Sequence, residues 1–367
     1  MKRLNVTNTS YYLCLNEYGH LLDGSGGSLK ESALGSDGCM WRLADRYLQC
    51  AVSDLTLELI DEPIPNQPCH FSGMGGEFFL QPGPSQLPSE HLVEMHNYGY
   101  TVLENVLDRE QLVQLKEGAA EKRARDHAGE ASTDGFFWMT DGLAWSRELC
   151  HAITHPVALW LIQHYLSTDD IHLCHMPVIS TVKPAKELKG TFPEDGWHSD
   201  YPYHPGVFPD EDWPESPIFG VQYNICIDEF RAGNGATQFV PGSHFFCKRP
   251  PSEFNEGGTR MGEGVHQDVQ QFHAPAGAAL VYDSRTWHRR CDELNTSGRD
   301  RMAMLNAVTQ SWVPPMWEKE SIGHLYKGSD VPDMLTERQR RDIDRLCNRE
   351  TQPRPEGMPI LLERQRI

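Results

Sequence analysis

Short apolar runs separated by glycine, proline and aspartate fill the stretch from about residue 171 to residue 313. This pattern is typical of strands joined by turns, and it favours a sandwich or a double-stranded barrel over a wound α/β fold. Further upstream, three leucines alternate with polar residues, a period of two that predicts a half-buried strand: Leu55, Leu57 and Leu59. The chain is therefore expected to be mainly β.

Helical patterns are fewer. Residues 97–106 (NYGYTVLENV) are strand-like, and we expect a helix after them because Asp108 and Gln111 have the spacing of a capping box. The apolar residues that follow have helical spacing: Leu112, Leu115 and Ala119. A second, strongly charged helix is predicted within residues 334–348.

Changes in composition divide the chain into three predicted parts. Residues 1–85 form a small β-rich module that ends in a proline- and glycine-rich linker, LQPGPSQLP, at residues 80–88. Residues 86–320 contain the main β domain with its flanking helices, and residues 321–367 form a C-terminal helix and tail. The N-terminal module and the C-terminal helix are the candidate surfaces for homo-oligomer contacts.

Charge and cysteine content narrow the class of protein. With 33 basic and 52 acidic residues the formal net charge is −19, which disfavours binding to nucleic-acid phosphates. No apolar run reaches the ~18–20 residues that cross a bilayer, and the N-terminus lacks the apolar core of a secretory signal. The ten cysteines include no C-x-x-C pair. We therefore expect reduced, mostly buried thiols and a cytoplasmic protein without membrane contact.

The stretch GWHSDYPYHPG, residues 196–206, concentrates side chains that bind metals. On a strand, residues i and i+2 point to the same face, so His198 and Asp200 are able to bind one ion together. A third ligand from elsewhere in the chain completes the two-histidine, one-carboxylate face of non-haem Fe(II) oxygenases, which leaves positions open for substrates. The alternative interpretation is a polar surface loop without a metal.

The same H-x-D spacing occurs again at His266 and Asp268. In a double-stranded barrel, the third ligand comes from a strand several strands later. Too few residues separate Asp268 from the histidines that follow it, whereas His288 is far enough from Asp200 for four or more strands to intervene. We therefore predict that His288 completes the first motif and that the second motif is a solvated loop.

Three segments resemble, in order and spacing, the phytanoyl-CoA dioxygenase-like family: GWHSD at residues 196–200, NGATQFVPGSH at residues 234–244 and YDSRTWHRRCDELNTSGRDRMAM at residues 282–304. The stretch NYGYTVLENVLDREQLVQL, residues 97–115, belongs to the same resemblance. Members of this family are Fe(II)- and 2-oxoglutarate-dependent oxygenases with a double-stranded β-helix, a jelly-roll or cupin-like core. The resemblance therefore implies this fold, with Fe(II), 2-oxoglutarate and dioxygen as cofactors.

Matched residue by residue, His198, Asp200 and His288 correspond to the iron ligands of the family. The family also has an arginine after the distal histidine that binds the 2-oxoglutarate carboxylate, a role that suits a bidentate guanidinium. Arg301 matches the sequence pattern around this arginine, and Arg299 matches its usual distance from the histidine. A period of two places both on one face of a strand, and we favour Arg301.

Other residues near these motifs are weaker candidates. Thr181, on the strand that leads to the H-x-D motif, is a candidate hydroxyl for 2-oxoglutarate. His244 closes a PGSH turn that is structural in the family, so we expect it to pack rather than to bind metal. Three lysines precede the motif and suit an anionic substrate group, although such a run is more often a solvated face: Lys183, Lys186 and Lys189.

Aromatic residues at the metal motif are the candidate substrate contacts: Trp197, Tyr201 and Tyr203. Prolines and a glycine exclude regular strand pairing in the connection from Tyr201 to about Pro217. A long connection inside a compact domain is usually functional or unstructured. We expect this one to form a lid over the iron, the alternative being a loop packed on the outer wall of the barrel.

The expected activity is hydroxylation of an unactivated C–H bond in a small-molecule metabolite, with release of succinate and carbon dioxide. Asp200 favours hydroxylation, because halogenases of this broader group have a small residue in place of the carboxylate. Desaturation and ring formation also fit. Two other interpretations stay open: a cupin-like ligand-binding protein without turnover, and an oxygenase that modifies a protein side chain.

Overall fold

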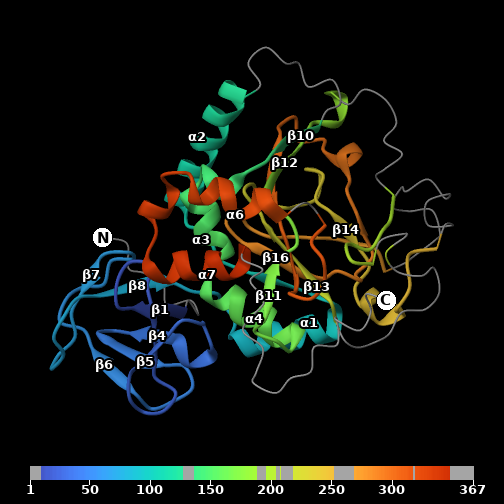
Figure 1. The fold of residues 1–367 in the computed structure, drawn as a ribbon. Coiled ribbons are helices and arrows are strands. Elements are labelled where there is room, and N and C mark those ends of the chain that lie inside the picture. Colours follow the sequence, from blue (N-terminus) through green and yellow to red (C-terminus); the bar gives the residue numbers. More distant parts are fainter. Residues whose placement is uncertain are drawn as a thin grey trace, which may run out of the picture.

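The computed structural model describes residues 10–126, 136–187, 196–203, 207, 218–251, 268–316 and 319–347. Antiparallel strands dominate these residues and form two eight-stranded sheets and one three-stranded sheet. Figure 1 shows the N-terminal strands, in blue, gathered at one side of the molecule, apart from the later sheets. The prediction of a mainly β protein is confirmed.

The first sheet has the strand order β3-β2-β1-β4-β5-β6, with β8 paired to β1 and β7 paired to β8. Its strands are β1 Ser10–Cys14, β2 Leu21–Asp23, β3 Lys30–Ser32, β4 Met40–Ala44, β5 Tyr47–Cys50, β6 Thr56–Glu58, β7 Pro68–Cys69 and β8 Phe78–Pro82. Leu57 and Leu59 are buried, as their alternation predicted, and they pack with Trp41 and Phe71 in a core that belongs to this sheet.

The predicted linker begins too early, because its first residues belong to this sheet. Leu80 pairs with Leu13 of β1 and is buried, so the first residues of LQPGPSQLP continue β8 instead of leaving the sheet. Pro82 is the last residue of the strand, where a proline is tolerated. Helix α1 (Pro88–Tyr98) begins at the last residue of the predicted linker, which leaves only a short connection.

The second sheet has the order β10-β12-β18-β13-β16-β9, with β19 paired to both β11 and β13, and the third has the order β15-β14-β17. Their strands are β9 Tyr100–Leu103, β10 Phe136–Met139, β11 Ile171–Leu173, β12 Val178–Val182, β13 Gly220–Ile225, β14 Gln238–Phe239, β15 Gln270–Gln271, β16 Ala279–Asp283, β17 His288–Arg289, β18 Arg301–Leu305 and β19 Ala307–Gln310. Strands far apart in the sequence, such as β12 and β18, are therefore neighbours.

The other helices are α2 Arg109–Asp126, α3 Arg147–Ile153, α4 Pro156–Leu166, α6 Lys319–Lys327 and α7 Glu337–Cys347, with 3-10 turns at Asp37–Cys39, Gly142–Ala144, Ala185–Glu187, Ser243–Phe246, Asp292–Leu294 and Val331–Met334. The capping box before α2 is confirmed, because the backbone N–H of Gln111 donates to Asp108 Oδ1 (2.8 Å) and that of Asp108 donates to Gln111 Oε1 (2.9 Å). Helix α4 was not predicted. It is buried on most sides, so its sequence lacks a polar face and a helical period.

Helix α7 holds the N-terminal sheet against the rest of the molecule. The guanidinium of Arg338, which is 2% exposed, donates to the backbone carbonyls of Tyr18, Gly19 and Thr154. It also forms an ion pair with Asp342 at 2.9 Å. The predicted C-terminal helix is therefore confirmed, and its buried face packs inside the molecule.

The cysteines behave as predicted. All ten are free thiols, and nine of them are buried. Among the residues that the structure describes, no helix combines the length and the apolar character required to cross a membrane.

Candidate metal centre

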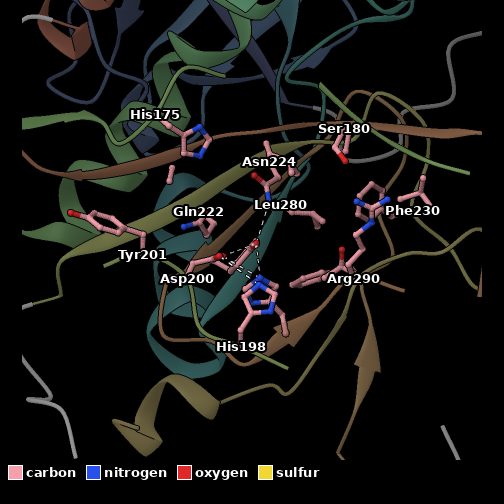
Figure 2. A pocket seen from close by; sticks show the side chains of 18 of the residues that line it. His175, Ser180, His198, Asp200, Tyr201, Gln222, Asn224, Phe230, Leu280 and Arg290 are labelled. Atoms are coloured by element: carbon pink, nitrogen blue, oxygen red, sulfur yellow. Dashed lines mark hydrogen bonds and ion pairs between the residues drawn. The ribbon is translucent and has the colours of Figure 1, made fainter. Parts of the chain in front are cut away.

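Two imidazoles and one carboxylate converge at a single point. Nε2 of His198 lies 3.8 Å from Asp200 Oδ1, and Nε2 of His288 lies 3.1 Å from Asp200 Oδ2. One ligand atom from each residue lies within 4.8 Å of the others. Figure 2 shows the imidazole of His198 beside the carboxylate of Asp200, joined by dashed lines. Two histidines and one carboxylate are the donor set that binds iron(II) in non-haem oxygenases.

Backbone pairing brings these side chains together. His198 and His288 form an antiparallel bridge, in which the N–H of each donates to the carbonyl of the other at 3.0 and 3.1 Å. Residues directly opposite in such a pair project to the same face. Two residues further on, the N–H of Asp200 donates to the carbonyl of Ser284 at 2.7 Å, which keeps Asp200 beside the same segment.

Each histidine is held in the tautomer that a metal requires. Nδ1 of His198 lies 2.8 Å from the carbonyl of Gly196, and Nδ1 of His288 lies 2.9 Å from the carbonyl of Thr286. Because a carbonyl only accepts hydrogen bonds, both Nδ1 atoms carry the proton and donate it. The lone pair therefore lies on Nε2, the atom that faces Asp200 in both residues.

A buried phenol orients the carboxylate. The hydroxyl of Tyr282 donates to Asp200 Oδ2 at 3.3 Å and accepts from Asn224 Nδ2 at 3.2 Å. Burial raises the pKa of Tyr282 well above its ordinary value, so the phenol keeps its proton. Burial alone would lower the pKa of His288, but the charge of Asp200 raises it above the ordinary histidine value. The negative charge of Asp200 therefore favours the protonated form of His288 in the absence of a metal.

The three residues lie in the wall of a cavity of about 320 Å³, a volume typical of small-molecule sites. Figure 2 shows polar and apolar side chains around it. The cavity is lined by His175, Ser180, Val182, His198, Asp200, Tyr201, Gln222, Asn224, Phe230, Thr237, Phe272, Leu280, Tyr282, His288, Arg290, Arg301, Ala303, Leu305, Ala307 and Met316. Apart from Asp200 and the two arginines, the titratable residues in this lining are histidines and tyrosines, so much of the wall is uncharged.

Arg301 contributes a buried positive charge to this cavity. It begins β18 and is 4% exposed. Its guanidinium donates to the carbonyls of Asn234 (3.2 Å) and Gly235 (3.0 Å) and lies over the ring of Phe230. Burial lowers the pKa of Arg301 to about 10. The other predicted candidate, Arg299, is exposed and precedes the strand, so the two arginines do not share a strand face.

The sequence model of the phytanoyl-CoA dioxygenase (PhyH) family matches residues 95–303, more than half of the chain. The chain belongs to this family. It is thus an enzyme of the 2-oxoglutarate oxygenase type, with iron(II) as its metal, 2-oxoglutarate as its cosubstrate and dioxygen as the oxidant. The matched residues include the three metal-site residues and Arg301.

Individual relatives of this PhyH-family chain are distant. Uncharacterised proteins of Mycobacterium bovis and Mycobacterium tuberculosis are each 24% identical to it over 222 residues, which cover 58% of this chain and 72% of each relative. Among solved structures, SnoN, a non-heme alpha-ketoglutarate-dependent epimerase from nogalamycin biosynthesis, is similar at 16% identity, with TM-scores of 0.44 and 0.45. The similarity covers 61% of this chain and 83% and 84% of SnoN.

A second arginine in the cavity of this PhyH-family chain was not identified from the sequence. Arg290 lines the cavity and forms an ion pair with the buried carboxylate of Asp292. Its position two residues after His288, on the same segment, is a sequence signal that could have identified it. Because its charge is balanced by Asp292, its role differs from that of Arg301.

Thr181 was the predicted hydroxyl for 2-oxoglutarate, but it is the residue before it that lines the cavity. In β12, Ser180 pairs with Ala303 and Val182 pairs with Arg301, and all four residues line the cavity. Thr181 lies between them and does not line the cavity, because successive residues of a strand point to opposite faces. The available hydroxyl on this strand is therefore that of Ser180.

Two of the three aromatic candidates also lie away from the cavity. Tyr203 is fully buried in a separate cluster with Phe219, and its hydroxyl accepts from the Phe219 N–H at 3.2 Å. Trp197 packs against Val240 and Trp287. Their apolar rings are used for packing instead of substrate contact. Tyr201 lines the cavity, and its hydroxyl donates to a backbone carbonyl at the C-terminal side of β19.

Other sequence candidates lie outside the cavity or outside the described residues. His244 lies in a turn, as expected, and is buried with its Nε2 3.2 Å from the carbonyl of His96. Lys183 forms an ion pair with Asp300 at 2.6 Å. Several predictions concern residues that the structure does not describe: the His266 motif, Lys189 and most of the predicted lid between Tyr201 and Pro217.

Proposed function

We propose that this protein is an Fe(II)- and 2-oxoglutarate-dependent dioxygenase that hydroxylates an unactivated C–H bond of a small-molecule metabolite, releasing succinate and carbon dioxide. The main support for this proposal is that one cavity contains both the cluster of His198, Asp200 and His288 and the buried guanidinium of Arg301. In this proposal the cluster binds iron(II), and Arg301 binds the distal carboxylate of 2-oxoglutarate.

The protein's part in binding the metal is to present three donors without rearrangement. The Nδ1 hydrogen bonds of His198 and His288 fix both rings, and the hydroxyl of Tyr282 restrains one carboxylate oxygen of Asp200. When bound, iron(II) supplies the activation of dioxygen that no protein side chain provides. The carboxylate of Asp200 supports hydroxylation over halogenation, since it occupies a position that a halide would need.

The charge of Arg301 supports its role toward 2-oxoglutarate. Within the described residues, no carboxylate forms an ion pair with Arg301, and its charge is balanced only by two carbonyls and an aromatic ring. A buried cation without an anionic partner is costly, and a carboxylate ligand relieves this cost through a bidentate pair. Ser180, on the neighbouring strand, supplies a hydroxyl to the same ligand.

The substrate is proposed to occupy the part of the cavity lined by Gln222, Tyr201 and Met316. These groups offer hydrogen bonds and apolar contact without a net charge, which suits a small, largely uncharged molecule. We also propose that the second and third sheets form a double-stranded β-helix and that the predicted domain boundaries at residues 85 and 320 apply. The cytoplasmic location and the homo-oligomer stay predictions.

Aerobic turnover with iron(II), 2-oxoglutarate and a metabolite extract tests this proposal. Mass spectrometry should find succinate together with a metabolite that has gained one oxygen atom, and neither should form with an Asp200→Ala variant. Succinate without a modified metabolite, but with a modified protein in the extract, would indicate an oxygenase that acts on a protein side chain. Metabolite binding without any succinate would indicate a binding protein and would contradict the proposal.

A further inference from the structure

A second cavity lies where the N-terminal sheet meets helices α2, α4 and α7. Its volume is about 380 Å³, within the range of small-molecule sites, and it shares no lining residue with the cavity at the metal centre. Figure 1 shows β1 and β8 of the N-terminal sheet close to α7, and residues of these elements form part of its wall. This cavity is therefore separate from the proposed oxygenase site.

Buried polar atoms without partners gather in its wall. Within the described residues, four buried side-chain nitrogen and oxygen atoms that lack a hydrogen-bond partner belong to residues that line this cavity: Tyr12 Oη, Asn66 Oδ1, Gln81 Nε2 and His155 Nδ1. Native proteins satisfy nearly all buried polar groups, with protein, water or ligand. Four such atoms around one cavity indicate that the cavity binds a molecule with polar groups.

Two of these residues form one polar surface on the N-terminal sheet. Tyr12 of β1 and Gln81 of β8 are directly opposite in the antiparallel pair, so their side chains project to the same face. They are 2% and 8% exposed. The thiol of Cys14 donates to Gln81 Oε1 at 3.4 Å, which identifies the amide N–H₂ as the end without a partner. This surface therefore offers an O–H and an N–H₂.

The other two unpartnered atoms belong to His155 and Asn66. His155, just before α4, is 3% exposed, and its ring lies 5.7 Å from that of Tyr12. Burial lowers the pKa of His155 to about 3, so the ring is neutral. The amide nitrogen of Asn66 donates to Asp108 Oδ2 at 3.1 Å, which leaves the amide oxygen as an acceptor. Residues with unpartnered donors and acceptors thus line the cavity from both the N-terminal sheet and the body.

The charges around the cavity favour a neutral ligand over an anionic one. An adjoining hollow of about 240 Å³ shares five lining residues with it: Tyr18, Asn66, Asp108, Gln111 and His151. The lining of this hollow has four carboxylates and one arginine: Glu17, Asp108, Glu110, Glu148 and Arg147. In the lining of the cavity itself, Asp108 and Arg109 carry opposite charges, and the charge of Arg338 is balanced by Asp342. A neutral molecule therefore meets no electrostatic penalty, whereas an anion meets the carboxylates of the adjoining hollow.

We propose that this cavity binds a neutral, hydroxyl-rich small molecule of about the size of a monosaccharide. A hydroxyl both donates and accepts, so a molecule with several of them satisfies the mixed set formed by Tyr12, Gln81, Asn66 and His155. The faces of the Tyr12 and Tyr18 rings suit the apolar C–H faces of such a molecule. The bound molecule joins the N-terminal sheet to the body, and its binding is independent of the metal centre.

Ligand-observed NMR and calorimetry on the full-length protein test this site. The probes are glucose, N-acetylglucosamine and myo-inositol, with glucose 6-phosphate as the charged comparison. At least one neutral probe should bind with saturation, and the phosphate should bind at least about tenfold more weakly. If none of the neutral probes binds, or if the phosphate binds as well as glucose does, the proposal is wrong.

Variants locate the binding to this cavity. Tyr12→Phe and Gln81→Leu each remove one hydrogen-bonding group and should weaken the bound probe by about tenfold. Tyr11→Phe is the matched control, because Tyr11 lies on the same strand but packs toward the other core, and it should bind the probe normally. Equal affinity in all variants, or a crystal structure with probe present that shows only ordered water on these atoms, would overturn the proposal. Both variants keep nearly the full side-chain volume, so circular dichroism should show them folded.

Discussion

The guanidinium carbon of Arg301 lies 4.0 Å from the centre of the Phe230 ring. The ring face and the carbonyls of Asn234 and Gly235 are the contacts that keep this buried cation in place. All three are weaker partners than a carboxylate, so the arrangement fixes the direction of the guanidinium and leaves most of its charge available to a ligand.

Replacing Arg301 by alanine should therefore remove the carboxylate-binding group while leaving the metal donors in place. We expect the apparent KM for 2-oxoglutarate to rise by about a hundredfold, as the loss of a shielded charge-assisted pair of about 3 kcal/mol implies. The affinity for iron(II), measured by anaerobic titration, should change little. Arg301→Lys should recover part of the loss, because it restores the charge without the bidentate geometry.

Arg299→Ala is the matched control for this change. Arg299 is exposed and precedes β18, so its removal should leave the KM for 2-oxoglutarate within about twofold of the unchanged protein. The reverse result, a normal KM in Arg301→Ala and a large increase in Arg299→Ala, would assign the carboxylate to Arg299.

Replacing either His198 or His288 by alanine should abolish stoichiometric iron(II) binding, because the two remaining donors bind iron far more weakly than three. Succinate formation should be lost with iron binding. Because His198 is partly exposed, the metal-free His198→Ala variant should have nearly the same thermal unfolding temperature as the unchanged protein. Iron content measured by mass spectrometry after anaerobic loading checks this. His266→Ala, which alters the second H-x-D motif, should bind iron normally; iron loss there with retention in His198→Ala would mean that the site was misassigned.

Much of this site was predictable, and the reason lies in local chemistry. His198 and Asp200 were identified because an H-x-D spacing places two donors on one side of an extended segment, a relationship that needs only neighbouring residues. His288 was predicted from its distance along the chain from Asp200, and the family resemblance then supported it. Its contact with His198 is formed by a long-range bridge that spacing alone does not reveal. Their roles as iron ligands stay predictions that the variants above address.

The failures have separate physical causes, and the first is strand register. The sequence shows that residues 178–182 are strand-like, but which alternate residues face the cavity depends on the pairing with β18, and a shift of one residue exchanges Thr181 for Ser180. Tyr203 was misplaced for a different reason, because an aromatic side chain near a motif packs wherever the chain turns. Buried helices such as α4 were missed because their sequences lack a polar face.

The register of β12 leads to a direct test. Ser180→Ala should raise the KM for 2-oxoglutarate by about three- to tenfold, since it removes one neutral hydrogen bond from the cavity wall. Thr181→Val keeps the shape of the side chain and removes a hydroxyl that faces away from the cavity, so its KM should not change. Steady-state kinetics with varied 2-oxoglutarate distinguish the two variants. A larger effect in Thr181→Val would mean that this strand is shifted by one residue.

Tyr282→Phe should weaken iron binding without removing a ligand. The change deletes the O–H that donates to Asp200 Oδ2 and that accepts from Asn224. Loss of a partner that orients a metal ligand typically lowers metal affinity by about 10–100-fold. Anaerobic titration with iron(II) measures the change. Tyr223→Phe, on the adjacent strand, loses a hydrogen bond to the carbonyl of Ala152 instead, so it should lower stability but leave iron affinity unchanged.

Arg338→Ala should destabilise the protein as a whole. The change leaves the carboxylate of Asp342 buried without its ion-pair partner and removes the donor for the carbonyls of Tyr18, Gly19 and Thr154. Breaking a buried pair in this way typically costs about 3–5 kcal/mol, which should appear as a lower midpoint of urea unfolding.

The same helix provides the control, because Arg340 is exposed and its guanidinium donates to the carbonyl of Pro332. Arg340→Ala should change the free energy of unfolding by less than about 0.5 kcal/mol. Because the carbonyls that Arg338 binds lie in both the N-terminal sheet and the body, its loss should also separate their unfolding into two transitions. A single transition with the midpoint of the unchanged protein would mean that Arg338 does not hold the two parts together, and that the apolar contacts between them are sufficient.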